Sequence, residues 1–388
     1  MSTRPLDGYR IIDLTANVAG PLACQVMADL GAEVIKVEPP TGEAARRITA
    51  TAPGAEHVTP YFSPNNRGKS SVRIDLTLPE GVASLMRLIE TSDVVVQGMR
   101  PGTLERKGLG PKQVAKLNPR CIYTSLSAYG GGSPLEDRAG IDMMVQAEAG
   151  CLSAQPTGAP RLIPFQLVDS ATGHVVAQAV LAALLHRERF GVVNHVAVSM
   201  YDVACSLQSN YLTLQMNLSA TGVREAPTGS RPVAVEPSGA FPTAAGDIVL
   251  AAYVPAHWAV FVQVIGRPEL AQDPRFVDQA ARSVHSTELR AVLFDVLSTR
   301  SADEWVAILD AAGLMAARVN MWPDVVASEI FARRNLSIHA VQDGVEVDVI
   351  RTPARFSAFD TTQHTTIPSL GGDDSLLAGI AEQNDSPA

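Results

Sequence analysis

Apolar stretches suited to strands alternate with amphipathic stretches suited to helices through the first 130 residues, and this alternation restricts the fold more than any other feature. In the first amphipathic stretch, Leu22, Val26 and Leu30 share one helix face. Strands that alternate with helices form a parallel sheet with right-handed crossovers. We therefore predict an α/β fold with strands at 9–14, 32–37, 72–76, 93–96 and 121–125 and helices at 21–30, 79–90 and 111–117.

The pattern changes in the second half of the chain. A long apolar helix is expected to end near residue 189, and a strand follows at 192–199. Residues 217–240 are rich in Gly, Pro and Ser and are predicted to be a linker. A hairpin at 241–253 and helices at 258–265, 286–297 and 301–312 then predict a smaller α+β domain, and alternation at 345–349 predicts a strand. The predicted segments are 1–216 (large domain), 217–240 (linker), 241–328 (small domain) and 329–388 (return to the large domain).

Composition excludes several classes of function. The length of 388 residues favours two domains, and the net charge of −9 argues against a nucleic-acid surface. None of the four cysteines has CxxC spacing and the histidines are not paired, so we expect reduced thiols, no metal site and a cytoplasmic protein. The amino terminus has no signal-peptide pattern, and the longest apolar candidate, residues 175–185, is too short to span a bilayer, so no membrane association is expected.

Three glycine-containing turns follow predicted strands. They are NNRGKSS (65–71), GMRPGTLERKGLG (98–110) and AYGGGSP (128–134), and the first two carry cations. Ligands of parallel sheets bind at the carboxyl ends of the strands, so these turns predict a rim that binds several phosphates. No GxGxxG or GxxxxGK[ST] motif is present, so neither a dinucleotide nor a P-loop nucleotide is predicted.

Asp169, in the stretch FQLVDSATGHVV, is the most isolated carboxylate at a strand-to-helix junction. Two interpretations are open from these residues. An aspartate at this place can cap the helix, because its oxygen accepts a backbone N–H of the first turn. It can also act chemically, and the positive end of the helix would keep the carboxylate ionised at neutral pH. A serine hydrolase is not predicted, because no GxSxG motif occurs.

Several phrases of the sequence together resemble one family. The opening LDGYRIIDLTANVAGPLACQVMADLGAEVIKVEPPTGEAAR is similar to that of the class III CoA-transferases, the family named for the carnitine and bile-acid CoA enzymes. The same family carries, in the same order, phrases like NNRGKSSVRIDL, DVVVQGMRPGTLERKGLG, NPRCIYTSLSAYG, VDSATGHVVAQAVLAALLHR, FPTAAGDIVLAA, IGRPELAQDPRF and IPSLGGDDSLLAGI. The resemblance covers nearly the whole chain.

The resemblance implies a large Rossmann-like domain built from both termini, a smaller domain joined by linkers, and a homodimer of two interlocked rings. It implies that Asp169 is a nucleophile that takes part in moving CoA from an acyl-CoA to a free carboxylic acid, with no permanently bound cofactor. The implied CoA contacts fall on Asn66, Arg67, Lys69, Gly98, Met99, Arg100, Arg106, Arg138 and Asp142. Among the glycines, Gly130, Gly131 and Gly132 are our candidates for oxyanion donors.

The sequence departs from two branches of that family. Formyl-CoA transferases have a glutamine where Val18 stands and a tyrosine where Ile141 stands, so oxalate and formate are not predicted substrates. The racemase branch has a histidine at the position of Ile141, which disfavours two-base racemisation. An acyl-CoA racemase or isomerase and a non-catalytic CoA-binding protein remain the alternative functions.

Overall fold

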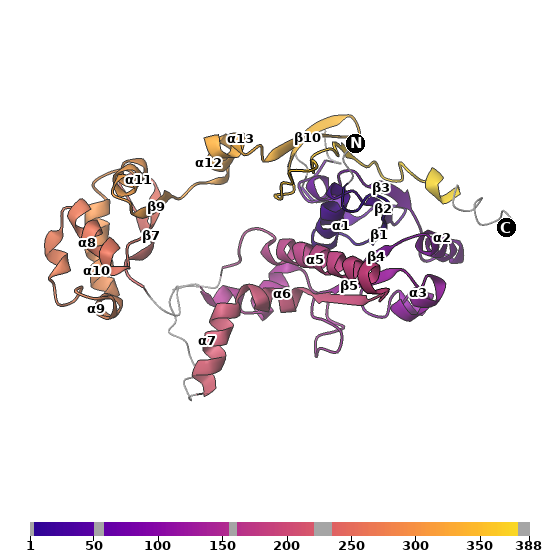
Figure 1. Ribbon diagram of the computed structural model, residues 1–388, viewed down its shortest axis with the longest axis horizontal. Coiled ribbons are helices and arrows are strands. Elements are labelled where there is room, and N and C mark those ends of the chain that lie inside the picture. The colour runs from indigo at the N-terminus through magenta and orange to yellow at the C-terminus, as the bar shows by residue number, and fades with distance from the viewer. Residues whose placement is uncertain (1–3, 50–57, 155–160, 221–234, 379–388) are drawn as a thin grey trace. The chain divides into compact units, whose positions relative to one another are not determined.

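The computed structural model describes residues 4–49, 58–154, 161–220 and 235–378 (Figure 1). These residues form two compact units. The first contains residues 4–49, 58–152, 161–212 and 335–378, and the second contains 153–154, 213–220 and 235–334. The large unit is thus built from both ends of the chain, as expected.

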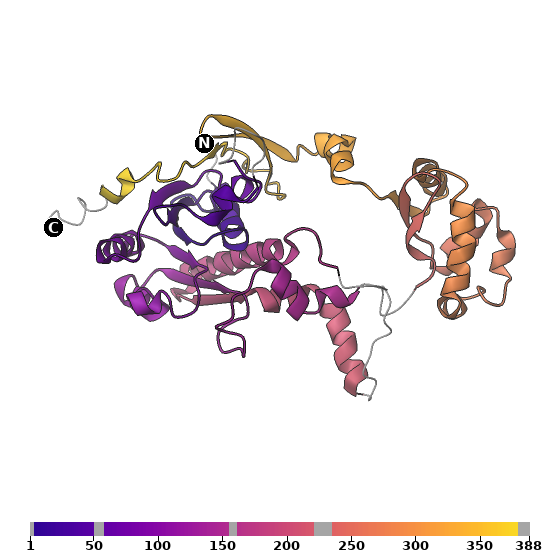
Figure 2. The same cartoon turned by 180° about the vertical axis from the view of Figure 1, so that it is seen from behind.

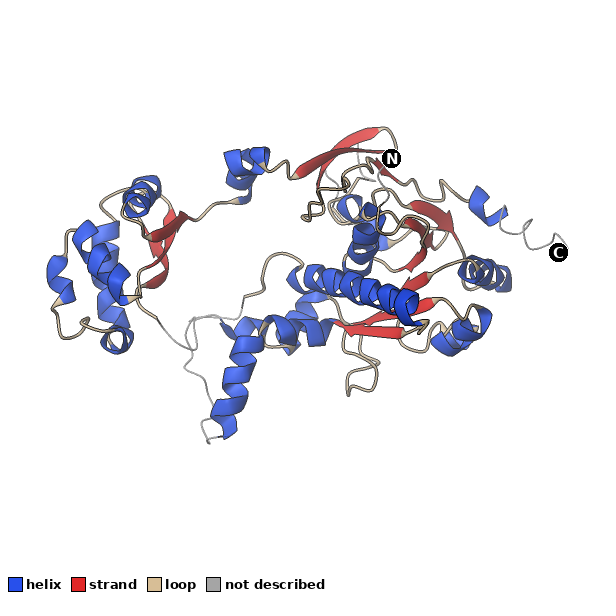
Figure 3. Ribbon diagram, viewed as in Figure 1, coloured by secondary structure: helices blue, strands red, loops and turns tan. Residues whose placement is uncertain are grey.

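A parallel sheet of six strands forms the centre of the first unit (Figure 3). Its strands are β1 (Arg10–Leu14), β2 (Glu33–Glu38), β3 (Ser70–Arg73), β4 (Val94–Gln97), β5 (Ile122–Ser127) and β6 (His195–Ser199). They lie in the order β3-β2-β1-β4-β5-β6, and every neighbouring pair is parallel. The prediction of a parallel α/β fold is confirmed. In this strand order, ligands bind where β1 and β4 lie side by side, because the winding reverses there.

Helices cover both faces of this sheet, because neighbouring residues of a strand point to opposite faces. Ile11 packs in a core with α1 (Ala19–Asp29) and α5 (Leu167–Phe190). Ile12 packs in a second core with α2 (Pro79–Glu90) and α3 (Pro111–Leu117). The described part of this unit also contains α4 (Asp142–Glu148), α6 (Met200–Leu207) and the start of α7 (Ser209–Ala220).

Helix α5 packs unusually close to α1. A Cβ atom added at Gly173 would lie 2.7 Å from the carbonyl oxygen of Ala19 and 3.0 Å from Cβ of Leu22, so only glycine fits without a shift.

Helix α5 is also long and apolar enough to cross a membrane by length and composition, which corrects the expectation that the longest apolar stretch is too short. Val176 and Val180 are fully buried in the first core, so α5 is a core helix of this unit.

The carboxyl-terminal residues complete the first unit. Strands β10 (Ser337–Gln342), β11 (Val345–Ile350) and β12 (Thr366–Ile367) form a small sheet, which confirms the strand predicted at 345–349. Farther on, Asp373 contacts the outer strand β3: its N–H donates to Ser71 O at 3.0 Å, and its carboxylate accepts the Ser71 N–H at 2.9 Å. Figure 2 shows this last part of the chain beside the N-terminal strands.

The second unit has its own sheet and core. Its strands are β7 (Ser238–Pro242), β8 (Asp247–Ala251) and β9 (Met315–Arg318), and its helices are α8 (Pro255–Val264), α9 (Gln279–Val284), α10 (Ser286–Leu297), α11 (Ala302–Ala311), α12 (Trp322–Ala327) and α13 (Glu329–Arg333). β7 and β8 are antiparallel, which confirms the predicted hairpin. Ser301 and Glu304 form the capping box that begins α11.

Several predicted boundaries need correction. The third strand lies at Ser70–Arg73 rather than at 72–76, and β6 begins only at His195. Both ends of the predicted linker have regular structure, because α7 continues to Ala220 and β7 begins at Ser238; residues 221–234 lie outside the described residues. No strand precedes Asp169, since residues 161–166 are irregular.

Candidate active site

A pocket of about 620 Å³ lies at the carboxyl edge of the parallel sheet. The residues that follow β1, β4 and β5 line it, together with the first residues of α1, α4 and α5. This is the place where the strand order predicts a ligand. The lining residues are Thr15, Ala16, Asn17, Val18, Ala19, Ile48, Tyr61, Gly98, Leu126, Ser127, Ala128, Gly140, Ile141, Asp142, Met143, Gln146, Leu162, Ile163, Pro164, Phe165, Gln166, Asp169 and Met200.

Asp169 lies inside the first turn of α5 and does not cap it. Its own backbone N–H donates to Oδ2 of Asp142 at 2.9 Å, so Asp142 supplies the carboxylate at this helix end. The residue before the helix, Gln166, makes no side-chain cap hydrogen bond. The capping interpretation of Asp169 is therefore wrong. Within the described residues, no hydrogen bond or ion pair engages its carboxylate, and Asp169 is a half-buried residue of the pocket lining.

Burial and the neighbouring Asp142 carboxylate together set the acidity of Asp169. Burial, and after it the negative charge of Asp142, raises the pKa of Asp169 to about 7. Both effects disfavour the ionised form. The sequence-based expectation of a fully ionised carboxylate at neutral pH is therefore corrected, because burial and Asp142 outweigh the helix end.

Asp142 is held by Gln146, one helical turn along α4. The Gln146 side-chain amide donates to Oδ1 of Asp142, and its oxygen accepts the backbone N–H of Ile163 at 3.0 Å. A second amide, that of Gln166, donates to the Tyr61 hydroxyl at 3.0 Å. The first contact holds the irregular segment 162–166 against α4, and the second holds it against Tyr61.

Buried charges hold the opposite wall. Lys36 donates to Thr15 O at 3.1 Å and forms an ion pair with Glu43 at 2.8 Å, and Glu43 accepts the Asn17 N–H at 2.7 Å. Asn17 adopts the left-handed conformation, with φ of 66°. Although burial favours the neutral carboxyl, Lys36 and Lys69 hold the pKa of Asp13 well below its usual range. The loop after β1 is therefore fixed by ions beneath it.

Comparison with known proteins assigns the chain to a family. The model for CoA-transferase family III matches residues 6–374. The chain belongs to CoA-transferase family III. It is an enzyme of the CoA-transferase type, and the resemblance inferred from its sequence is confirmed.

The similarity to its relatives extends over nearly the whole length of the chains. The chain is 50% identical to "Probable fatty acyl-CoA transferase Rv3272" of Mycobacterium tuberculosis over 95% of this chain and 96% of that one. The crystal structure of Rv3272 superposes with a TM-score of 0.88 at 48% identity, covering 97% and 100% of the two chains. A CAIB/BAIF family protein from Brucella suis gives 0.84 at 30% identity, with 98% and 100% covered.

Four of the residues predicted to contact CoA in this family III enzyme, Asn66, Arg67, Lys69 and Asp142, are buried. Arg67 pairs with Asp29 at 2.9 Å, and Lys69 donates to Asp13, to Pro21 O and to Asn66. The charges of Arg67 and Lys69 are therefore neutralised within the fold and are not presented to a phosphate. The phosphate-binding rim predicted at residues 65–71 is corrected accordingly.

The segment after β4 fits its predicted role better. Gly98 lines the pocket, and Met99 is half-buried beside it. Arg100 and Arg106 are exposed, and neither side chain has an ion-pair partner in the described part of the chain. Arg138 is exposed too, but it pairs with Glu148 and lies outside the pocket lining. The structure thus places Gly98, Asp142 and Asp169 in the lining of one pocket. Arg100 and Arg106, which follow Gly98 in the sequence, have no ion-pair partner among the described residues.

The glycine turn after β5 does not reach the pocket. Gly130 and Gly132 donate their N–H groups to Ser127 Oγ at 3.1 Å and to Glu136 Oε2 at 2.8 Å, and Gly131 is exposed. These three glycines are not among the lining residues, so their predicted role as oxyanion donors is not supported by their position.

Gln146 was not predicted as a site residue from the sequence. The available signal was its spacing of four from Asp142, which places both side chains on one face of a helix.

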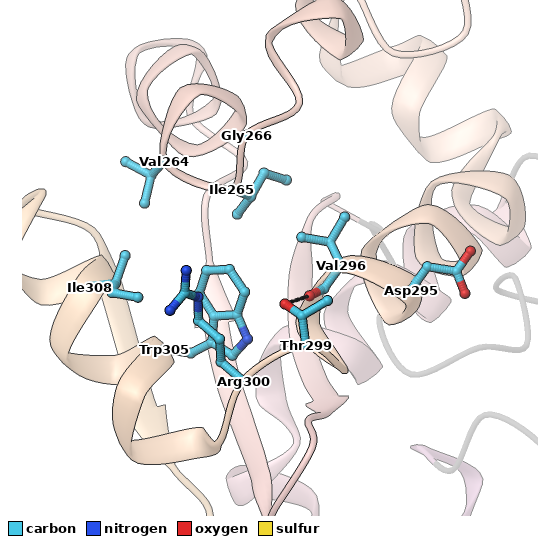
Figure 4. Close-up of a pocket in the computed structure, with 9 residues that line it drawn as sticks. All are labelled: Val264, Ile265, Gly266, Asp295, Val296, Thr299, Arg300, Trp305 and Ile308. Carbon is cyan, nitrogen blue, oxygen red and sulfur yellow. Dashed lines mark hydrogen bonds between the residues drawn. The ribbon is translucent and has the colours of Figure 1, made fainter.

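A second hollow in this CoA-transferase lies within the small unit (Figure 4). It measures about 440 Å³ and is bounded by Val264, Trp305 and Ile308, with Arg300 over the Trp305 ring. None of the residues predicted from the sequence to act in catalysis or CoA binding lines it. The pocket of Asp169 is therefore the candidate active site.

Proposed function

We propose that this enzyme moves CoA from an acyl-CoA donor to a free carboxylic acid through covalent intermediates on Asp169. The observation that supports the proposal most is the unpaired, half-buried Asp169 carboxylate in a pocket at the carboxyl edge of the sheet. A carboxylate held without a cation is a stronger base and a stronger nucleophile once it is ionised. The family membership supplies the reaction type.

The transfer takes four balanced steps. An Asp169 oxygen attacks the thioester carbonyl, the C–S bond breaks, and a mixed anhydride and a CoA thiolate form. The thiolate attacks the aspartyl carbonyl and releases the donor carboxylate, which leaves an aspartyl-CoA thioester. The acceptor carboxylate attacks this thioester and expels the thiolate. The thiolate then attacks the acceptor acyl carbonyl, which yields the new acyl-CoA and restores Asp169. No proton is consumed and no redox change occurs.

CoA must remain bound while it is a thiolate, so its phosphates need cations. We assign these to Arg100 and Arg106, the exposed arginines after β4, because Arg67 and Lys69 are neutralised inside the fold. Arginine binds phosphate through charge-assisted, often paired hydrogen bonds. Formate and oxalate are not proposed as substrates, because Val18 and Ile141, where the chain departs from formyl-CoA transferases, both line the pocket.

We also propose that the enzyme is a homodimer in the cytoplasm. Exposed apolar side chains on α12 and α13 support the first part: Trp322 and Ile330 are each 71% exposed, which a partner chain would cover. Sedimentation should show a dimer that persists at nanomolar protein concentration. A folded monomer at that concentration would contradict the proposal.

The covalent mechanism is tested by trapping. The enzyme is incubated with acyl-CoA, hydroxylamine is added, and the peptides are analysed by mass spectrometry. A hydroxamate should form at Asp169, because hydroxylamine cleaves an aspartyl thioester or anhydride. Asp169→Asn should bind acyl-CoA but form no adduct and lose transfer by several orders of magnitude, whereas Asp137→Asn, at an exposed site, should behave like wild type. Near-normal transfer by Asp169→Asn would exclude the mechanism.

A further inference from the structure

The described lining of the pocket around Asp169 contains two carboxyl groups and no cation. Among its described lining residues, Asp142 and Asp169 are acidic, and none is Lys, Arg or His. Lys36, which donates to Thr15 O in that lining, is paired with Glu43, and Lys69 is paired with Asp13. The charged side chains of the described lining would therefore repel an anionic group inside the pocket.

Half of the neutral polar side chains of the described wall donate to other protein groups. The Thr15 hydroxyl donates to Asp13, the Gln146 amide serves Asp142 and Ile163, and the Gln166 amide serves Tyr61. These bonds hold the wall together and leave the Asn17 amide and the Tyr61 and Ser127 hydroxyls as side-chain donors. A second carboxylate of a bound acid would find neutral donors there but no cation to offset the loss of its hydration.

Large apolar side chains occupy the remaining wall. Ile141 and Met143 come from the start of α4, and Leu162 and Phe165 come from the segment before α5. They are 52%, 46%, 46% and 51% exposed, respectively, although side chains of this kind are normally covered. Their exposure within the pocket of a reactive carboxylate indicates that the group bonded to that carboxylate covers them.

We propose that the acyl groups exchanged at Asp169 are apolar monocarboxylic acids, aliphatic or aromatic, and that the pocket rejects dicarboxylic acids. The inference rests on the proposed function, because it identifies the acyl pocket by Asp169. One carboxyl group of an acceptor reacts at Asp169, and its other end lies among the apolar side chains. A second carboxylate at that end stays unpaired and faces Asp142, which disfavours binding.

The test compares hexanoate with adipate as acceptors, with butyryl-CoA as the donor. The two acids have the same number of carbons and differ in a terminal methyl or carboxylate. The expected kcat/KM for hexanoate exceeds that for adipate by roughly 100-fold or more, the size of effect that an unpaired buried charge produces. If the two kcat/KM values lie within about tenfold of each other, the inference is wrong, because a single CH₂ group gives discrimination of that size.

Two neighbouring methionines provide a matched pair of variants. Met143 lines the pocket, whereas Met144, 43% exposed, does not. Met143→Lys places a cation in the wall and should raise kcat/KM for adipate by roughly 10- to 150-fold, the value of a charge-assisted hydrogen bond. Met144→Lys should change it little. Equal gains from both variants, or none from Met143→Lys in a folded protein, overturn the assignment of this wall.

The hydroxylamine adduct separates failure of the inference from failure of the proposed function. If butyryl-CoA yields the adduct at Asp169 and adipate is used as well as hexanoate, the mechanism stands and the acyl specificity is wrong. If the adduct forms and neither hexanoate nor benzoate accepts CoA, the inference is again wrong. If no acyl-CoA yields an adduct, the proposed function itself fails.

Discussion

Replacing Asp169 by asparagine should stabilise the protein at alkaline pH while it abolishes transfer. In the folded protein, burial and the Asp142 charge raise the pKa of Asp169 to about 7 from an ordinary value of 3.8. Asparagine has the same shape and carries no charge to be desolvated. The variant therefore removes an unfavourable ionisation and retains the packing.

The sign and size follow from linkage. Between pH 3.8 and about 7 the folded state binds the Asp169 proton more tightly than the unfolded state does, so this carboxyl group stabilises the folded state below that window. The contribution is lost as the pH rises through about 7. Three pKa units correspond to about 4 kcal/mol, which partial exposure to solvent reduces to about 1–3 kcal/mol. Asp169→Asn should gain this amount over wild type at pH 8 and almost nothing near pH 4.

The assay is urea unfolding of both proteins at pH 4.5 and pH 8, followed by far-ultraviolet circular dichroism. All three tryptophans, Trp258, Trp305 and Trp322, lie in the second unit, so their fluorescence would not report on the unit that contains Asp169. Asp137→Asn is the control and should show no pH-dependent difference. If Asp169→Asn differs from wild type by the same free energy at both pH values, or is destabilised at pH 8, the argument from burial and Asp142 is wrong.

Three further substitutions test other parts of the structure. Arg106→Ala should raise the KM for acyl-CoA about 10- to 150-fold in steady-state kinetics, and Arg138→Ala should have a smaller effect because that arginine is already paired. Lys36→Met should cost about 3–5 kcal/mol in denaturant unfolding, because it leaves buried carboxylates without their cation, whereas the exposed Lys116→Met should cost almost nothing. Gly173→Ala should lower the free energy of unfolding by about 1–3 kcal/mol, because its methyl group meets a backbone carbonyl of α1.

The sheet could be predicted because its signals are local. The strands of the sheet carry their own apolar patterns, and helices such as Pro79–Glu90 and Pro111–Leu117 begin with proline and coincide with the predictions. Helix α4 was not predicted: it has only seven residues and lacks the proline that marks the start of the equally short α3. The contact between Asp142 at the start of α4 and the Asp169 N–H was therefore not predicted either.

The pairing of charges could not be predicted in the same way. Arg67 and Lys69 lie in a segment whose sequence predicts an exposed turn. In the structure they are buried and form ion pairs with Asp29 of α1 and Asp13 of β1. The partners in these ion pairs are 38 and 56 positions apart, so no local pattern in a single sequence indicates that they pair. The raised pKa of Asp169 had the same origin, since it depends on a carboxylate 27 positions away.

The contact of Asp373 and Asp374 with β3 has a consequence for synthesis of the chain. β3 is the outer strand of the sheet, and its backbone groups at Ser71 and Arg73 are bonded to these two aspartates. During translation, β3 is made about 300 residues before Asp373 and Asp374, the residues that bond its outer edge. The second unit is made between them. An unpaired outer strand invites pairing with other chains. The nascent enzyme therefore carries an open sheet edge until Asp373 and Asp374 have been made, and during that time the edge is exposed to pairing with other chains.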